Sequence, residues 1–313
     1  MTDAVVVDRI TKRFGPVVAV NSVSLVIRTG ELFGCIGPDG AGKSTLFRML
    51  TTLLVPDAGT ARVLGHDVVQ DLWALRPRIG YMPGRFSLYP DLSVAENLTF
   101  FASVFGTSVE REYAQIAPIY VQLEAFKDRR AGALSGGMKQ KLALCCALVH
   151  RPDILILDEP TTGVDAVSRR EFWDLLAQFK AGGLTIVVST PYMDEANRCD
   201  RVAFMQGGRF LAIDTPDAIT RSFERRLYAI RSPKRYAALL ALREYPHTHT
   251  VYPFGEALHY TDRRTDTPNE TVSAEVVAYL AARGNAGAAA VPIPATIEDS
   301  FMARMSGAVE GAT

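Results

Sequence analysis

The most constraining feature of the sequence is a glycine-rich segment, Gly37-Pro38-Asp39-Gly40-Ala41-Gly42-Lys43-Ser44-Thr45. It fits the spacing G-x-x-x-x-G-K-[ST], follows an apolar run and precedes apolar residues at helical spacing, so the strand, loop and helix context of the motif is present. Glycines let the backbone turn its N–H groups inward, and the first turn of a helix adds unpaired donors. The segment predicts a loop that binds the phosphates of a nucleoside triphosphate; the alternative is a glycine-rich turn with a chance lysine.

Two side chains of this loop have predicted roles of their own. Lys43 is placed to neutralise charge between the β- and γ-phosphates, and the Ser44 hydroxyl is placed to ligate Mg²⁺. The motif alone does not indicate what the energy of the nucleotide drives.

Two acidic residues follow a strongly apolar run. Residues 154–157 read Ile-Leu-Ile-Leu, which predicts a strand buried on both faces of a parallel sheet. Asp158 and Glu159 come at its carboxyl end, where α/β folds place their chemistry. Burying two adjacent carboxylates without partners would be costly, which argues against a purely structural role. We expect Asp158 to hold Mg²⁺, usually through water, and Glu159 to act as general base on the attacking water.

A further anion site is suggested by the segment Leu134-Ser135-Gly136-Gly137. Ser135 is a predicted N-cap, and the two glycines open an apolar helix that runs to His150. A serine hydroxyl and bare glycine amides at a helix N-terminus suit a phosphate group. The alternative is a purely structural role, a glycine-containing turn before a core helix.

The remaining periodicity predicts an α/β pattern with a helical insertion from about residue 84 to 130. The insertion holds a helix at 93–105, capped by Ser93 with Glu96 three residues on, and a second helix at 108–123. Phe14 lies in an early turn, where it either stacks on an adenine ring or packs on the sheet; spacing alone favours packing. Other expected elements are strands at 5–10, 22–28, 60–64, 78–82, 184–189, 201–205 and 209–213, and helices at 166–180, 191–196 and 215–223.

The region 223–313 is predicted to be a separate α+β accessory domain. Its elements follow the order β-α-β-β-α-β, which is consistent with a ferredoxin-like unit. His247, His249 and His259 are expected to be ordinary strand-surface residues, because no cysteine or acidic cluster accompanies them at ligand spacing.

Composition excludes several classes of protein. The 34 Lys and Arg balance the 34 Asp and Glu, so nucleic acid is an unfavoured partner. The N-terminus has no signal-peptide layout, and no apolar stretch approaches the roughly 20 residues that cross a bilayer. The four cysteines form no C-x-x-C pair and are expected to be buried thiols in a reducing compartment, which indicates the cytosol.

Taken together, the phosphate loop, residues 134–140, the acidic strand end and Gly163-Val164-Asp165 resemble, in order and spacing, the ATP-binding subunit of an ABC transporter. The resemblance covers roughly residues 3–222. It implies a P-loop NTPase fold of the ABC type over residues 1–222, with a helical subdomain at about 84–150, that binds ATP with Mg²⁺ and hydrolyses ATP.

The resemblance also implies a head-to-tail dimer with two ATP molecules between facing domains. The phosphate loop and the acidic pair of one domain then contact the γ-phosphate, while the signature residues Ser135, Gly136 and Gly137 and the D-loop residue Asp165 come from the other. Phe14 is implied as the adenine-stacking residue. The helical insertion, from near Met82 and Pro83, is implied as the surface that acts on a membrane partner.

Further details resemble the ABC-2 class of exporters and their multidrug-type ATPases: Tyr81-Met82-Pro83, Leu88-Tyr89, the run from Gly136 to Lys141, and Tyr192-Met193-Asp194-Glu195-Ala196. Two positions depart from the family pattern. Gly84 stands where a glutamine is usual and Pro191 where a histidine is usual, and neither side chain can donate or accept a hydrogen bond. Losing two polar contacts to a developing charge predicts a loss of about 10²-fold or more in rate, with ATP binding retained.

The leading hypothesis is therefore the ATP-binding subunit of an ABC-2 type export system. It would be peripheral on the cytoplasmic face of the inner membrane and would act on a separate permease together with a second ATP-binding domain, identical or different. One alternative is a slowly hydrolysing regulatory partner in an asymmetric pair, favoured by Gly84 and Pro191. The other is a soluble, ribosome-associated ABC ATPase, which the balanced charge and the single signature segment disfavour.

Overall fold

The computed structural model of the chain describes residues 2–85 and 87–310, with side chains described as far as residue 305. The chain divides into two compact units, Met1–Pro216 and Asp217–Thr313. The division falls a few residues before the predicted boundary at residue 222. None of the helices in the described ranges combines the length and the apolar character that crossing a bilayer requires.

The strands of the first unit form two sheets. They are β1 Asp3–Phe14, β2 Val17–Arg28, β3 Leu32–Ile36, β4 Ala58–Val63, β5 His66–Asp67, β6 Ile79–Met82, β7 Ile154–Asp158, β8 Thr185–Thr190, β9 Arg201–Gln206 and β10 Arg209–Asp214. The larger sheet has the order β10-β9-β3-β8-β7-β6 and is parallel except for the pair β9 and β10. The smaller sheet is antiparallel, in the order β2-β1-β4-β5.

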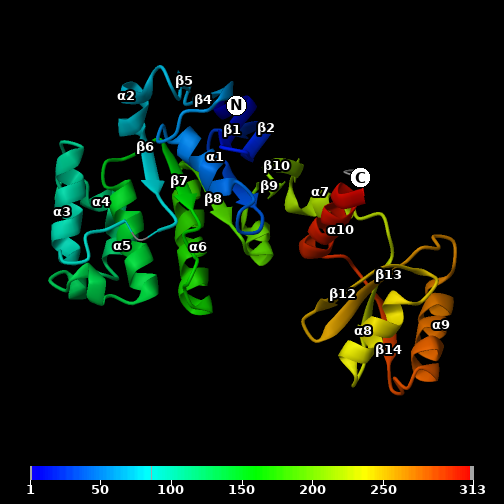
Figure 1. The fold of residues 1–313 in the computed structure, drawn as a ribbon. Helices are drawn as coiled ribbons and strands as arrows, with labels where there is room; N and C mark the ends of the chain where they lie inside the picture. The colour runs from blue at the N-terminus through cyan, green and yellow to red at the C-terminus, as the bar shows by residue number, and fades with distance from the viewer. Residues whose placement is uncertain (1, 86, 311–313) are drawn as a thin grey trace. The chain divides into compact units, whose positions relative to one another are not determined.

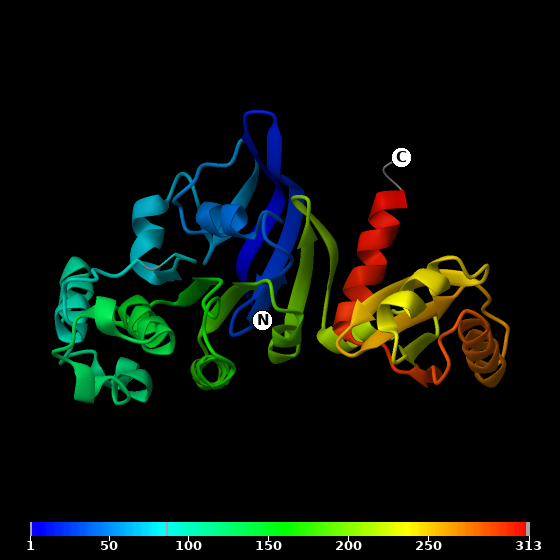
Figure 2. The same cartoon turned by 60° about the horizontal axis from the view of Figure 1, so that its bottom comes forward.

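Helices cover both faces of the larger sheet. They are α1 Lys43–Leu50, α2 Leu72–Leu75, α3 Val94–Val104, α4 Tyr113–Tyr120, α5 Gly136–Leu148, α6 Ala166–Ala181 and α7 Pro216–Arg221, with 3₁₀ turns at Arg76–Arg78, Glu124–Phe126, Ala131–Ala133 and Met193–Arg198. Figure 2 shows α5 and α6 on one side of this sheet and α1 with the hairpin of β1 and β2 on the other. The buried core on the α1 side includes Phe33, Leu46 and Phe47.

The α/β prediction is confirmed, with two local errors in the helical insertion and beyond it. The predicted capping box is present, since Ser93 Oγ accepts from the Glu96 N–H at 3.1 Å and Glu96 accepts from the Ser93 N–H at 2.7 Å. The helix expected at 108–123 was too long: only α4 forms, because Glu112 is buried before it and accepts the Thr107 hydroxyl at 3.0 Å, which holds the preceding residues in turns. The helix expected at 191–196 is the 3₁₀ turn Met193–Arg198.

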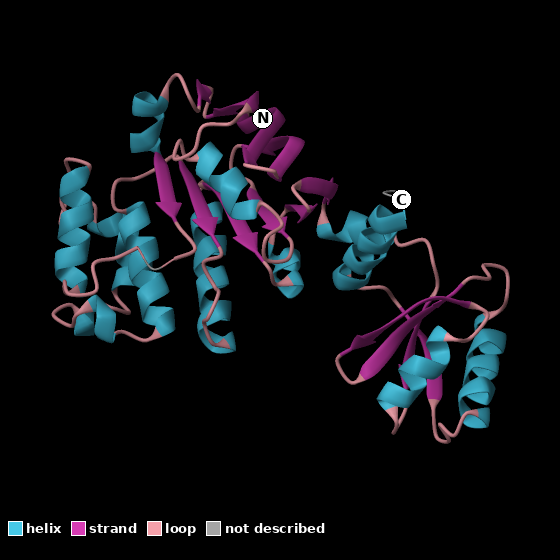
Figure 3. Cartoon of the chain, in the orientation of Figure 1, coloured by secondary structure: helices cyan, strands magenta, loops and turns pink. Residues whose placement is uncertain are grey.

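The second unit has the predicted β-α-β-β-α-β order, followed by one more helix (Figure 1). Its elements are β11 Leu227–Arg231, α8 Arg235–Arg243, β12 Thr248–Phe254, β13 Ala257–Asp262, α9 Asn269–Ala282, β14 Ala289–Ile293 and α10 Ile297–Glu310. The antiparallel sheet has the order β12-β13-β11-β14. Helices α8 and α9 pack on one face of it, over a core that includes Tyr228 and Tyr260 (Figure 3).

The prediction that all three histidines lie on a strand surface was wrong for His259. Its side chain is buried, and its Nδ1 lies 2.5 Å from Asp299 Oδ1 of α10. The alternation of β13 did place it on the face away from the α8 and α9 core, but α10 covers that face. His247 precedes β12 instead of lying in a strand, and His249 is exposed on β12.

Candidate nucleotide-binding site

The phosphate loop joins β3 to α1, and its backbone leaves no room for side chains at two glycines. A Cβ on Gly37 would lie 2.1 Å from the Met205 carbonyl oxygen, and one on Gly42 would lie 2.3 Å from the Ala19 carbonyl oxygen. Gly42 also has φ of 108°, in the left-handed region that favours glycine, directly before the first turn of α1. Pro38, Asp39 and Gly40 are exposed at the tip of the loop.

Lys43 begins α1, and its ammonium lies inside the loop. The side chain is only 3% exposed, and Nζ donates to the carbonyl oxygens of Gly37 at 2.7 Å and Pro38 at 3.0 Å. Nζ is also 3.2 Å from Glu159 Oε1. A buried ammonium, glycine amides and a helix N-terminus around one small space suit a polyphosphate.

The acidic strand end meets the other end of the same loop. Ser44 Oγ donates to Asp158 Oδ1 at 3.0 Å, and Asp158 is buried at the end of β7. A serine hydroxyl and a carboxylate are hard oxygen ligands of the kind that Mg²⁺ takes. The residues present therefore fit a magnesium ion beside a triphosphate.

Glu159 adopts an unusual backbone conformation directly after β7. Its φ is +51°, and its N–H donates to the carbonyl and the hydroxyl of Ser189 at 3.1 and 2.9 Å. A non-glycine residue is held in this region only where its surroundings fix it. The turn points the carboxylate toward Lys43, so both predicted γ-phosphate residues lie together.

Phe14 lies at the end of β1 and is not part of this cluster. Its side chain is 50% exposed, and the Lys12 ammonium lies 5.8 Å from the ring centroid. The ring is therefore half-exposed, and whether it stacks on a base stays a prediction.

The signature residues open α5 at some remove from the loop. Ser135 is the N-cap, accepting from the Met138 N–H at 3.3 Å, and is exposed with Gly136. Among the hydrogen bonds of the described part of the chain, none joins Ser135 to the phosphate loop. The helix is instead held against α6: a Cβ on Gly137 would lie 2.6 Å from Ser168 Oγ, and Lys141 Nζ bonds Glu171 Oε2 at 2.6 Å.

Asp165 caps α6 and is exposed. Its side chain accepts from the N–H groups of Ser168 at 2.9 Å and Val167 at 3.0 Å. These bonds, that from Ser168 foremost, hold the pKa of Asp165 below its usual value. The carboxylate therefore stays ionised at the start of the helix.

The two departures from the family pattern lie on either side of the acidic pair. A Cβ on Gly84 would lie 3.1 Å from the Asp158 carbonyl oxygen and 3.6 Å from its Oδ2. Pro191 directly follows β8, beside the buried Glu195, which accepts the hydroxyls of Thr190 at 2.5 Å and Thr161 at 2.9 Å.

Ser189 was missed by sequence reasoning. It is buried on β8 opposite Asp158 in the sheet register, and its Oγ donates to Asp158 Oδ1 at 2.6 Å as well as accepting from Glu159. Its place at the end of the predicted strand 184–189 was the only available signal. Glu195 with its two threonines was also missed.

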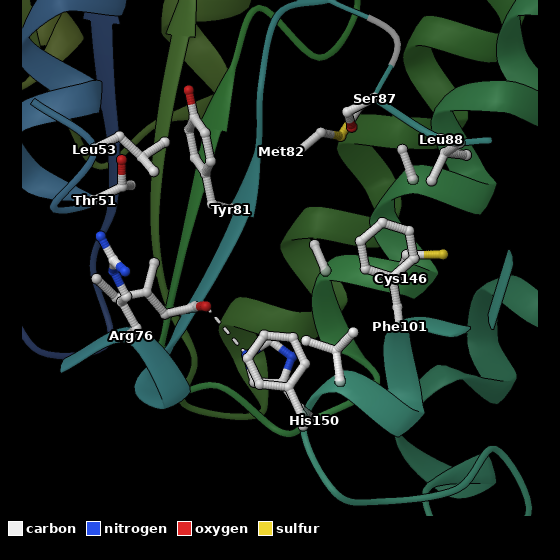
Figure 4. A pocket seen from close by; sticks show the side chains of 15 residues that line it. Thr51, Leu53, Arg76, Tyr81, Met82, Ser87, Leu88, Phe101, Cys146 and His150 are labelled. Atoms are coloured by element: carbon white, nitrogen blue, oxygen red, sulfur yellow. Dashed lines mark hydrogen bonds between the residues drawn. The ribbon is translucent and has the colours of Figure 1, made fainter. Parts of the chain in front are cut away.

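A cavity of about 360 Å³ separates the helical insertion from the larger sheet (Figure 4). Tyr81 and Met82 line one side, and Phe101, Cys146 and His150 line the other. His150 Nε2 lies 3.1 Å from the Ile79 carbonyl oxygen, and its ring stacks on Phe105 with centroids 3.7 Å apart. Val104, at the rim, is 60% exposed.

The loop, the acidic strand end and the parallel sheet define the class: the first unit is a P-loop NTPase domain. The chain belongs to the ABC transporter family, whose sequence pattern it matches over residues 20–162.

Two curated relatives illustrate the match. The probable multidrug ABC transporter ATP-binding protein YbhF of Escherichia coli (strain K12) is 45% identical over 213 residues, which is 66% of this chain and 36% of that protein. This chain thus matches little more than a third of YbhF. Nod factor export ATP-binding protein I of Burkholderia lata is 42% identical over 216 residues, covering 68% of this chain and 71% of that protein.

Solved structures agree in fold. CbiO1 from Clostridium perfringens, part of the ABC transporter complex cbiONQ, is 26% identical with a TM-score of 0.63, over 71% of this chain and 92% of that one. The ATP-binding cassette MJ0796, dimeric and bound to ADP and Pi, is 26% identical with a TM-score of 0.61, over 67% and 98% of the two chains.

Proposed function

We propose that this chain is the ATP-binding and ATP-hydrolysing subunit of an ABC-2 type exporter, acting as one half of a head-to-tail dimer on a separate permease. The observation that carries the proposal is a pocket that holds only part of the expected residues. Ser44 and Asp158 lie 3.0 Å apart, and Lys43 and Glu159 lie 3.2 Å apart. Ser135 is not among them and is exposed at the start of α5. A second copy or a related domain would supply Ser135, Gly136, Gly137 and Asp165 to this pocket.

Each residue of the pocket has a separate task in this proposal. Lys43 and the loop amides bind the phosphates, and Phe14 stacks on the adenine. Ser44 and Asp158 would hold Mg²⁺, which would supply charge neutralisation at the phosphates. Glu159 orients the attacking water and accepts its proton, and the Ser189 bonds keep Glu159 in place.

The test is steady-state ATP hydrolysis by the purified chain, with dimerisation followed by light scattering. We expect magnesium-dependent turnover that Glu159→Gln abolishes while ATP-dependent dimers accumulate. Ser135→Ala should reduce turnover without reducing ATP binding. Equal turnover in wild type and Glu159→Gln, or full activity in a chain that stays monomeric with ATP, would contradict the proposal.

The names of the relatives support export as the driven process. One is described as a multidrug transporter protein and the other as a Nod factor export protein. We propose a peripheral position on the cytoplasmic face of the inner membrane, with the cavity of Figure 4 receiving a segment of the permease. Its apolar lining between two subdomains would transmit their relative motion.

The docking proposal can be tested with a pair of matched substitutions. Val104 and Val121 are both valines of the helical insertion and both 60% exposed, but only Val104 lines the cavity. Val104→Lys should abolish recovery of the chain with membranes and with its permease, and Val121→Lys should not. Equal recovery of both variants would locate the permease contact elsewhere.

The second candidate, a slowly hydrolysing partner in an asymmetric pair, is favoured by Gly84. A side chain there would begin 3.6 Å from the Asp158 carboxylate, and glycine leaves that position without a polar group. Gly84→Gln should raise turnover about tenfold or more if the missing amide limits the rate. Gly182→Gln is the control, since its Cβ would meet a carbonyl at a similar 3.2 Å, on Phe179 at the end of α6. Brisk wild-type turnover that Gly84→Gln leaves unchanged would exclude this candidate.

A further inference from the structure

The second unit contains a cavity of about 560 Å³ that the proposed ATPase function does not use. Three parts of the unit enclose it: the segment before β11 with Ser222 and Arg225, the β12 and β13 strands with Thr250 and Thr261, and α10 with Ser300 and Arg304. Small-molecule sites in proteins span about 300–1,000 Å³, so the space suits an organic ligand.

The cavity lies on the polar face of a two-faced sheet. Tyr260 and Val251 point into the apolar core under α8 and α9, and their neighbours in the register, Thr261 and Thr250, point to the opposite face. These two hydroxyls are 2.6 Å apart. A sheet face that only had to pack a helix would be expected to be apolar.

The two arginines give the cavity lining an excess of positive charge. Arg304 donates to Ser222 Oγ at 2.6 Å, and Arg225 donates to the carbonyl oxygens of Asp262 and Arg263, both at 3.4 Å. Among the ion pairs of the described side chains, none includes Arg225 or Arg304. Arg225 and Arg304 are both residues of intermediate exposure, and a guanidinium has five N–H donors. Glu224 also lines the cavity but is exposed, so the charged lining is two guanidinium groups against one carboxylate.

We infer that this cavity is a binding site for a small organic anion, whose phosphate or carboxylate group lies between Arg225 and Arg304. The planar guanidinium fork matches both kinds of oxyanion, and the hydroxyls of Thr250, Thr261 and Ser300 supply neutral partners for the rest of the ligand. No part of this inference depends on the ATP site.

Binding would also strengthen the attachment of α10 to the rest of the second unit. Asp299 already links α10 to the sheet through Tyr252 and His259. An anion held by Arg304 of α10 and by Arg225 before β11 would reinforce the connection that the Arg304–Ser222 bond already makes between these two segments. Ligand binding should therefore reduce local unfolding of α10.

The experiment is hydrogen exchange of the full chain, followed by mass spectrometry, with inorganic phosphate and citrate as the two probes. Exchange localises each effect, so binding of phosphate at the Lys43 loop is read separately from protection of residues 297–304. We expect at least one probe to protect α10 in a saturable way. Protection by phosphate alone assigns a phosphorylated ligand, and protection by citrate alone assigns a carboxylate; either supports the site.

Substitutions then separate the cavity from general charge effects. Arg304→Gln and Arg225→Gln should each raise the midpoint concentration about tenfold or more, as for a lost charge-assisted hydrogen bond. Arg243→Gln removes the same charge from an exposed position on α8 and should leave the midpoint unchanged. Arg225 is not on α10, so its variant keeps the test valid if Arg304→Gln loosens the helix. Protection reproduced by sodium chloride at equal ionic strength, protection by neither probe, or unchanged midpoints in both cavity variants would overturn the site.

Discussion

Removal of the Asp299 carboxylate should detach α10 from the sheet of the second unit. Asp299 is fully buried and accepts four hydrogen bonds: from Tyr252 Oη at 2.6 Å, His259 Nδ1 at 2.5 Å, the Thr296 hydroxyl at 2.6 Å and the Thr296 N–H at 2.7 Å. An ionised carboxylate only accepts, so His259 carries its proton on Nδ1. Asp299→Ala would leave the buried His259 Nδ1–H without an acceptor and would also remove the bonds from the half-buried Tyr252 and the exposed Thr296.

The magnitude follows from the number and kind of the orphaned groups. A hydrogen bond to a charged group contributes about 1.5–3 kcal/mol, and a buried donor left without an acceptor costs about 1–3 kcal/mol, so the loss of all four bonds should cost about 3–5 kcal/mol. Tyr252→Phe removes a single donor and leaves the other three bonds, so it should cost only about 1 kcal/mol. Burial alone would raise the pKa of Asp299, but the bonds from Thr296, Tyr252 and His259 outweigh it and hold the pKa below its usual value. The contribution is therefore present above about pH 4 and is lost as pH falls through that value toward the lowered pKa.

Native-state hydrogen exchange measures the effect locally, through the free energy of opening of β12, β13 and α10. We expect Asp299→Ala to lower it by several times the Tyr252→Phe effect, and the difference to disappear in acid. If both variants lower it equally, or if Asp299→Ala has no effect, the carboxylate does not hold the helix.

Three shorter predictions concern the first unit. Gly37→Ala should abolish ATP binding, because its Cβ would lie 2.1 Å from the Met205 carbonyl oxygen. At Gly40 a new Cβ would have no atom of the described chain within 4 Å beyond its immediate neighbours, so Gly40→Ala should bind ATP with at most about tenfold loss from backbone strain. A nucleotide titration compares the two variants. Burial lowers the pKa of His150, although its bond to the Ile79 carbonyl opposes this shift. The unfolded chain therefore binds the proton at higher pH than the folded chain does, and stability should fall as pH drops below about 6.5. Urea titrations should show a smaller loss of stability in acid for His150→Gln. Ser189→Ala should lower kcat about tenfold or more with little change in KM, because Ser189 positions Asp158 and Glu159 without a place at the phosphates, and an unchanged kcat would refute that role.

Local sequence signals were sufficient for much of the fold. The glycine spacing before Lys43, the unbroken apolar run before Asp158 and the Ser93 cap all act over a few residues, and each element that they predicted is present. The structure also brings Ser44 to Asp158 and Lys43 to Glu159, as their assigned roles require. The roles themselves stay predictions, as do those of Phe14, Ser135 and Asp165.

Long-range contacts were beyond these signals. His259 alternates correctly for a surface position, and only the return of α10 through Asp299, 40 residues later, buries it. Ser189 reaches Asp158 across 31 residues through the parallel register of β7 and β8. The late start of the helix predicted at 108–123 likewise depends on Glu112, which contacts Arg151 from a distant part of the chain.

The tight packing of Gly137 on Ser168 limits how the first unit can move. Lys141, one turn further along α5, is also hydrogen-bonded to Glu171 of α6. These two contacts restrict movement of the start of α5 relative to the start of α6. A tilt of the helical insertion that advances Ser135 must then carry Asp165 with it. If Ser135 and Asp165 act on a neighbour's nucleotide as proposed, they would approach and leave it together. A larger side chain at position 137 should then let the two residues move separately.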